Sequence, residues 1–246
     1  EFSPEEQIKL ADSFVAAFVA GGVGLTDFLD GAHLLAQLPT RQAVVAAMSV
    51  LSDVINVWSA DHGERQQLQT ALREVYAEPA AQAGLTNVEN YEQSDHQHRL
   101  VNFQAMVVED PVLRRTLMAQ AAAYVSYEQD DVAVAEEQNL SLMDISLGVA
   151  VEEWGLPFVE HLYALLKSSQ DPVLRRRIVS SLASARDEKA AARVHEMILD
   201  PNLRNNEIFG MLFSQIDETA TRAAAWAWFQ QDFDKVLKRV PEWAQG

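Results

Sequence analysis

Six histidines are the side chains of this chain whose ordinary pKa lies near neutral pH, and histidine is also a common metal ligand. A zinc-binding helix of the peptidase type needs two histidines four positions apart, with a glutamate directly after the first. His195 and Glu196 begin this pattern, but the second histidine is replaced by Leu199, so the pattern fails. His96 and His98 are two positions apart, and on a helix they would point to different sides. We therefore expect no metal site in this chain.

The segment around Asp95, His96 and His98 has two interpretations, a weak surface metal site and a solvated polar segment, and the missing geometry favours the second. His161 lies in a helical pattern and is expected at the edge of the core. Adjacent side chains on a helix diverge by about 100°, so paired acids suit a solvated face better than an acid–base pair. Such pairs occur at Glu5-Glu6, Asp130-Asp131, Glu136-Glu137 and Glu152-Glu153.

Other sequence patterns of catalytic sites are also missing from the chain. The chain has neither a nucleophile-elbow sequence nor a glycine-rich phosphate loop. We therefore predict that this chain alone is not an enzyme and binds no cofactor. A helical enzyme with a new kind of site is a minor alternative. The lack of converging histidines and acids argues against it.

Charge and composition exclude two classes of partner. The chain has 19 basic and 36 acidic residues and a formal net charge of −17. A surface this acidic repels nucleic-acid phosphates and anionic membranes, and no apolar run approaches the roughly 20 residues that span a bilayer. We predict neither nucleic-acid nor membrane binding. The absence of cysteine excludes disulfides and thiolate sites but leaves the compartment open, because a chain of 246 residues needs no covalent staples.

The elements that would position any site are helices, because helical periodicity runs through almost the whole chain. Ser3-Pro4-Glu5-Glu6 predicts a capped helix start, Gly21-Gly22 predicts the end of that helix, and Pro39-Thr40 predicts a later break. No segment has the alternation and β-branched enrichment of a strand. We predict an all-α protein with one domain, 1–246.

The least periodic stretch of the chain is 84–95, which is polar. We predict a loop there, joining possible sub-layers at 1–83 and 96–246. The chain opens at Glu1-Phe2 without an initiator methionine, so we expect a fragment of a longer chain.

An internal repeat is the most informative feature of the sequence. The segment Asp110–Arg115 recurs word for word as Asp171–Arg176, and a shorter copy follows at Asp200–Arg204. Asn139–Met143 fits a degenerate copy between the first two. The underlying period is about 30 residues, the length of one helical hairpin.

Each part of the repeated motif has a physical role. Its aspartate is expected to cap a helix, its proline occupies a position where the missing N–H costs nothing, and its leucine packs inward. Its first arginine can reach an acid in its own or the neighbouring repeat. Since a single hairpin cannot bury its apolar face, the hairpins must stack. We predict a right-handed α-α superhelix of antiparallel hairpins, similar to HEAT or armadillo solenoids.

An aromatic stripe lies near the end of the chain. Trp226, Phe229 and Phe233 are three and four positions apart, and Trp228 lies beside them. We predict core packing for this stripe, with a ligand-binding aromatic wall as the alternative.

Three segments resemble the C-terminal domain of aminopeptidase N-like and endoplasmic-reticulum-aminopeptidase-like zinc enzymes. Arg222–Asp234 resembles the family's GR-x-x-AW-x-F-x-x-NWD signature, and Leu203–Glu207 resembles the R-x-QD element before it. Pro4–Phe14 resembles the helix that opens the same domain. The resemblance covers nearly the whole chain. It departs from the signature at Thr221, which replaces the glycine, and at Asp232-Phe233, which replaces the Asn-Trp pair.

The resemblance implies where the chemistry of the parent protein lies. In that family the zinc site belongs to an upstream catalytic domain, and the C-terminal helices form a bowl that encloses the active-site cavity and in some members contacts peptide substrates. Carried over by position, Arg204, Glu207 and Arg222 are the implied peptide contacts. An inter-repeat salt bridge is the alternative role for each.

The resemblance leads to a functional prediction. We predict the non-catalytic C-terminal domain of a zinc metallo-aminopeptidase, which encloses the active-site cavity and helps to gate or bind peptides. Its partners would be the upstream catalytic domain and the peptide. The alternative is a free-standing helical-repeat scaffold that binds a protein on its concave face.

Overall fold

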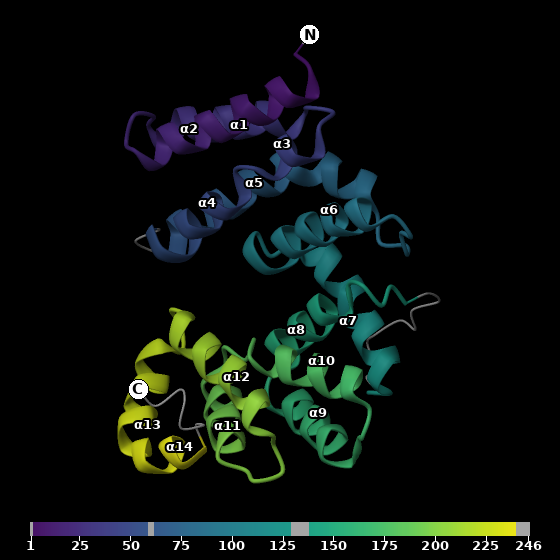
Figure 1. Cartoon of the computed structure of the whole chain (residues 1–246), viewed down its shortest axis with the longest axis vertical. Helices are drawn as coiled ribbons and strands as arrows, with labels where there is room; N and C mark the ends of the chain where they lie inside the picture. The colour runs from purple at the N-terminus through teal and green to yellow at the C-terminus, as the bar shows by residue number, and fades with distance from the viewer. Residues whose placement is uncertain (1, 59–61, 129–137, 240–246) are drawn as a thin grey trace. The chain divides into compact units, whose positions relative to one another are not determined.

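The computed structural model describes residues 2–58, 62–128 and 138–239, and the regular elements in these ranges are all helices (Figure 1). The prediction of an all-α fold is confirmed. The first half contains α1 (Pro4–Val19), α2 (Leu25–Ala36), α3 (Arg41–Val45), α4 (Met48–Asp53), the π-helical turn η1 (Val54–Trp58), α5 (His62–Ala83), α6 (Tyr91–Asn102) and the π-helical turn η2 (Phe103–Val107). The second half contains α7 (Pro111–Val125), α8 (Met143–Trp154), α9 (Leu156–Ser168), α10 (Pro172–Leu182), α11 (Glu188–Ile198), α12 (Asn205–Asp217), α13 (Arg222–Gln231) and α14 (Phe233–Arg239).

Two compact units make up the chain. The N-terminal unit comprises Glu1–Leu113 with Asn139–Leu142, and the C-terminal unit comprises Arg114–Gln138 with Met143–Gly246. The division therefore falls within α7, whereas the sequence suggested a connection at 84–95. None of the described helices is long and apolar enough to cross a membrane.

The predicted start of the first helix is confirmed. The hydroxyl of Ser3 accepts a hydrogen bond from the backbone N–H of Glu6 at 3.3 Å, and the carboxylate of Glu6 accepts one from the backbone N–H of Ser3 at 2.7 Å. These two bonds form a capping box, which satisfies N–H groups that have no partner inside the helix. The helix ends at Val19, and Gly21 follows with a φ of 77°, a conformation that favours glycine.

The non-helical stretch near the middle of the N-terminal unit is shorter than predicted, because α6 begins at Tyr91 instead of after 95. Asn90 is the reason. Its side chain accepts a hydrogen bond from the backbone N–H of Gln93 at 3.0 Å and so caps the helix. The polar composition of 84–95 thus reflects a capped helix start as well as a loop.

Two buried amide side chains hold the remaining loop in place. Gln97, which is 1% exposed, donates to the carbonyl oxygens of Ala83, Gly84 and Thr86 at 3.1, 3.1 and 2.9 Å. Asn139 donates to the side-chain oxygen of Gln97 at 3.0 Å and to Thr86 at 3.1 Å. These bonds satisfy backbone carbonyls at the end of α5 and in the loop that follows it.

The core of the N-terminal unit contains a stack of aromatic rings between α1 and α2. The ring of Phe28 lies 4.0 Å from that of Phe18 and 5.3 Å from that of Phe14, measured between centroids. Gly31 makes this approach feasible, because a Cβ at that position would overlap the ring of Phe14 at Cζ.

The core of the C-terminal unit draws fully buried side chains from consecutive helices. Helices α8, α10 and α12 contact one another in order, as do α9, α11 and α13, so the helices form two rows. This is the arrangement that stacked hairpins require. The right-handed superhelix over the whole chain stays a prediction. One fully buried residue from each of α8 to α12 belongs to this core: Leu147, Phe158, Ile178, Val194 and Met211.

Two copies of the repeated motif cap helices as predicted. Asp110 and Asp171 each accept hydrogen bonds from the backbone N–H groups two and three residues later, at 2.9 and 2.8 Å for Asp110 and at 2.8 and 3.4 Å for Asp171. The prolines Pro111 and Pro172 are the first residues of α7 and α10.

The prediction that Asp200 caps a helix is wrong, since α12 begins only at Asn205. Its carboxylate instead accepts hydrogen bonds from the backbone and side-chain nitrogens of Asn202, at 2.8 and 2.7 Å, and from the hydroxyl of Tyr163. The carbonyl of Asp200 also accepts from the N–H of Leu203 at 3.1 Å, which closes a turn. The third copy therefore forms a turn before the helix.

The degenerate copy, Asn139–Met143, also forms a turn before the next helix, as the third copy does. Asn139 accepts a hydrogen bond from the N–H of Ser141 at 3.0 Å, and α8 begins at Met143. Copies that cap a helix therefore alternate with copies that form a turn, and the helices that follow the four copies start roughly 30 residues apart.

Candidate functional site

The three residues implied as peptide contacts do not meet at one place. The side chain of Arg204 is exposed, and its residue precedes α12, while Glu207 lies buried in the first turn of that helix. Arg222 lies beyond the other end of α12, where its guanidinium donates to the carbonyl oxygens of Ile216 and Asp217 at 2.9 and 2.6 Å. A helix of 13 residues is about 20 Å long, so the structure separates Arg222 from the other two.

Glu207 is part of a buried ion pair. Its carboxylate accepts hydrogen bonds from Nε and Nη2 of Arg175 at 2.9 and 2.8 Å, and from the backbone N–H of Arg204 at 2.8 Å. Burial raises the pKa of Glu207, but these bonds and the nearby positive charges outweigh burial and lower it overall. Glu207 therefore joins the repeat that begins at Asp171 to the next one.

The arginine of the first motif copy makes an equivalent connection. Arg114 donates to Glu152 at 2.9 Å and to Glu153 at 2.7 Å. Arg186 lies 3.3 Å from Glu152 and 3.0 Å from Glu218, so the ion pairs continue to the end of α12. The expectation that Glu152 and Glu153 lie on a solvated face is wrong for Glu152, whose side chain is 5% exposed. The other pairs at Asp130-Asp131 and Glu136-Glu137 lie outside the described residues.

The interrupted zinc pattern has a packing role. His195 is 3% exposed, and its ring stacks on that of Trp228 with centroids 4.9 Å apart. Burial lowers the pKa of His195. Glu196 pairs with Arg193 at 3.0 Å. No group of three or more His, Asp or Glu side chains in the described ranges could hold a metal ion.

The aromatic stripe is only partly in the core. Trp228 and Phe229 pack against the core of the C-terminal unit, but Trp226 is 50% and Phe233 45% exposed. The three rings of Trp226, Phe229 and Phe233 follow one another at centroid distances of 5.7 and 5.5 Å. The prediction of core packing is therefore wrong for Trp226 and Phe233, because one helix face cannot bury all four rings.

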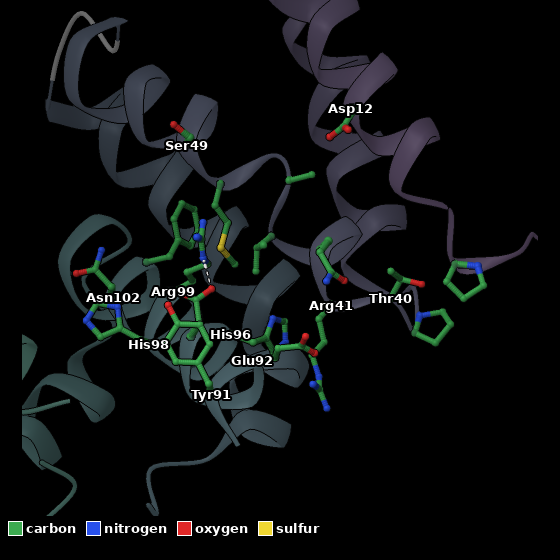
Figure 2. Close-up of a pocket in the computed structure, with 18 of the residues that line it drawn as sticks. Asp12, Thr40, Arg41, Ser49, Tyr91, Glu92, His96, His98, Arg99 and Asn102 are labelled. Atoms are coloured by element: carbon green, nitrogen blue, oxygen red, sulfur yellow. Dashed lines mark hydrogen bonds and ion pairs between the residues drawn. The ribbon is translucent and has the colours of Figure 1, made fainter. Parts of the chain in front are cut away.

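A cavity of about 880 Å³ lies in the N-terminal unit, between α1, α3, α4 and α6 (Figure 2). Figure 2 shows Arg99 with Arg41 and His96 on one side of it and His98 on the other. Arg99 pairs with Asp95, which also lines the cavity, at 2.8 Å. The predicted solvated polar segment thus forms one wall of a cavity. The other lining residues that Figure 2 labels are Asp12, Thr40, Ser49, Tyr91, Glu92 and Asn102.

A second cavity in the same unit has a volume of about 820 Å³ and lies against α5. Its wall includes Glu74 and Glu78, which lie one turn apart on α5, and His33 of α2. The sequence singled out His96, but Pro39-Thr40, directly before Arg41, was interpreted only as a helix break. The sequence signal for these cavities was Arg41, a basic residue directly after Pro39-Thr40 in a chain where acidic residues outnumber basic ones.

The C-terminal unit has a smaller cavity of about 580 Å³. Its wall combines the stacked rings of His195 and Trp228 with small side chains and a rim of charged ones. The small side chains are Ala191, Ala192, Ala220 and Ala224, and the charged ones are Arg186, Glu188, Glu196, Asp232 and Lys235.

The described residues thus form an all-helical protein whose C-terminal unit packs its helices in two rows, with buried ion pairs between helices of that unit. The family model of the ERAP1-like C-terminal domain matches residues 1–245. The chain therefore belongs to this family, which indicates that its parent protein is an aminopeptidase. No curated protein matches the chain.

Proposed function

We propose that this chain is the non-catalytic C-terminal domain of a zinc metallo-aminopeptidase, and that it encloses the active-site cavity and helps to gate or bind peptide substrates. The zinc would be held by the upstream catalytic domain of the same polypeptide. The residues described in this chain do not fit a zinc site, because His195 is packed against Trp228 and Glu196 is held by Arg193.

The observation that carries the proposal is the family match over residues 1–245, which includes both units. A match to one helical hairpin would also suit a free-standing scaffold. A match over nearly the whole chain favours the aminopeptidase domain, since both units then have counterparts in that family.

Arg204 is the proposed peptide contact whose side chain is exposed to solvent. Its positive charge also helps to lower the pKa of the buried Glu207. Glu207 would position Arg204, because its carboxylate holds the backbone N–H of that residue. Arg222 would contact the peptide at a separate place, because its guanidinium is hydrogen-bonded to carbonyls at the end of α12.

The test uses the full-length parent protein and this chain alone, both assayed with zinc. We expect the parent to hydrolyse aminoacyl-anilides and peptides, and the chain alone to hydrolyse neither. In the parent, Arg204→Ala should raise KM for peptides and leave KM for a small anilide unchanged. Arg115→Ala is the matched control, because Arg115 is also an exposed arginine.

Turnover by the chain alone would contradict its non-catalytic role. A parent sequence without an upstream H-E-x-x-H motif would contradict the assignment of the zinc site. Equal KM values for Arg204→Ala and Arg115→Ala would remove Arg204 from the peptide contacts while leaving the enclosing role intact.

A further inference from the structure

The two large cavities of the N-terminal unit share a wall. Pro39, Arg41 and His96 line both of them. Arg41 is the first residue of α3 and His96 lies in the middle of α6, and these two helices are in contact. Two side chains that can carry positive charge therefore stand together between two spaces that are each large enough for a small ligand.

Neither side chain has a protein partner in the part of the chain that the structure describes. The guanidinium of Arg41 makes no hydrogen bond or ion pair there. The Nδ1 atom of His96 is buried without a hydrogen-bond partner. The side chain of Arg41 is exposed, and its lack of an ion pair distinguishes it from the arginines of the described ranges that pair with an acid, namely Arg65, Arg73, Arg99, Arg114, Arg175, Arg177, Arg186 and Arg193.

The local charge favours an added anion. Burial lowers the pKa of His96, and the positive charge of Arg41 lowers it further, while Asp95 has a smaller opposing effect. The imidazole is therefore neutral at pH 7. Asp95 itself pairs with Arg99 at 2.8 Å, and Glu92 forms no ion pair with Arg41 within 4.0 Å. An anion between Arg41 and His96 would accept hydrogen bonds from the guanidinium of Arg41, for which the described residues supply no partner.

We propose that Arg41 and His96 form a binding site for a small oxyanion, a phosphate or carboxylate group, on the wall between the two cavities. A guanidinium presents a planar fork of N–H donors that matches two oxygens of either group. A neutral imidazole with its proton on Nε2 adds one more donor and keeps the buried Nδ1 as an acceptor. The net charge of −17 opposes unspecific anion binding, so binding here must come from local contacts.

The experiment follows the histidine ring signals of the whole chain by NMR at pH 7 and constant ionic strength. Inorganic phosphate is added in one series and sodium acetate in another. We expect a saturable shift of the His96 signals, with the signals of His62 unchanged. Because His96 would gain an anionic neighbour, its pKa should rise on binding.

Three variants test the assignment. Arg41→Gln should weaken binding at least tenfold, which is about 1.4 kcal/mol and the scale of one charge-assisted hydrogen bond. Arg41→Lys should bind with intermediate strength, because it keeps the charge without the fork. Arg176→Gln is the matched control, since Arg176 is exposed and lies in the C-terminal unit. Amide spectra check that each variant is folded.

The outcomes separate clearly. Saturation by phosphate alone or by acetate alone supports the site and identifies its oxyanion. Equal shifts of all histidine signals, no shift of His96 with either anion, or wild-type binding by folded Arg41→Gln would overturn the proposal.

Discussion

Replacing Glu207 by glutamine tests the buried ion pair that joins two repeats. The side chains of Arg175 and Glu207 are 6% and 9% exposed, and two hydrogen bonds join them. Breaking a buried pair on one side costs about 3–5 kcal/mol, because the other charge stays buried. Arg175 keeps its bonds to the carbonyls of Leu166 and Ser169, so we expect the lower end, about 3 kcal/mol.

The matched control is the same substitution in an exposed pair. Glu160 pairs with Arg193 at 2.6 Å, but their side chains are 47% and 28% exposed. Exposed pairs contribute about 0–1 kcal/mol, so Glu160→Gln should change stability by no more than that. The double variant Arg175→Met/Glu207→Leu removes both charges and should recover most of the loss.

The pH dependence of the free energy of unfolding tests the same ion pair independently. In the folded protein the pKa of Glu207 lies below its ordinary value of 4.5. A carboxyl with a depressed folded pKa contributes stability above the unfolded pKa, and this contribution is lost as the pH falls through the folded pKa. Wild type should therefore lose stability below about pH 4.5 more steeply than the double variant, which cannot titrate there.

Native-state hydrogen exchange on the amides of α10 and α12 measures the free energy of opening in this region. Exchange is preferable to a single unfolding curve, because a chain with two units need not unfold in one step. The reasoning is refuted if Glu207→Gln changes this free energy by no more than Glu160→Gln does, or if the double variant is less stable than Glu207→Gln.

Three further predictions concern other buried features. His195→Phe keeps a ring against Trp228 but cannot take up a proton. Because burial lowers the pKa of His195, wild type should lose stability as the pH falls below 6.5. In urea unfolding followed from pH 7 to 5, the variant should lose less stability than wild type. Gly31→Ala places a Cβ against Phe14 and should destabilise the chain by about 1–3 kcal/mol in the same assay, and an unchanged midpoint would contradict that packing. Gln97→Leu leaves three carbonyls without their donor and should speed hydrogen exchange in residues 84–90, whereas unchanged protection there would show that the loop does not depend on this amide.

The helices were predictable because their signals are local. Ser3 and Glu6 form the expected capping box, and Asp110 and Asp171 cap the expected helices. The loop at 84–95 was predicted too long, because Asn90 could be read equally as a loop residue and as a cap. Local patterns give the helix but not always its first residue.

The candidate site was harder to predict, because it depends on which side chains lack partners. The sequence shows that His96 is polar and that Arg41 follows a helix break. It does not show that α3 and α6 bring these residues onto one wall while Arg99 takes the nearby carboxylate of Asp95. Similarly, Glu152 in a pair of adjacent acids looked solvated, and only its contacts with arginines from other helices explain its burial.

The motif copies argue that identical words need not have identical roles. In the two verbatim copies the aspartate caps a helix, and the arginine four residues later, Arg114 or Arg175, binds an acid of a later helix. In the third copy Asp200 is held by Tyr163 and Asn202 in a turn, so Arg204 falls before α12, where its side chain is exposed. The buried, paired arginines therefore hold neighbouring helices together, whereas the turn at Asp200 places Arg204 before α12, where its side chain makes no such connection within the described ranges. Among the three arginines at this position of the motif, Arg204 is therefore the one whose side chain is exposed, as its proposed role as a peptide contact requires.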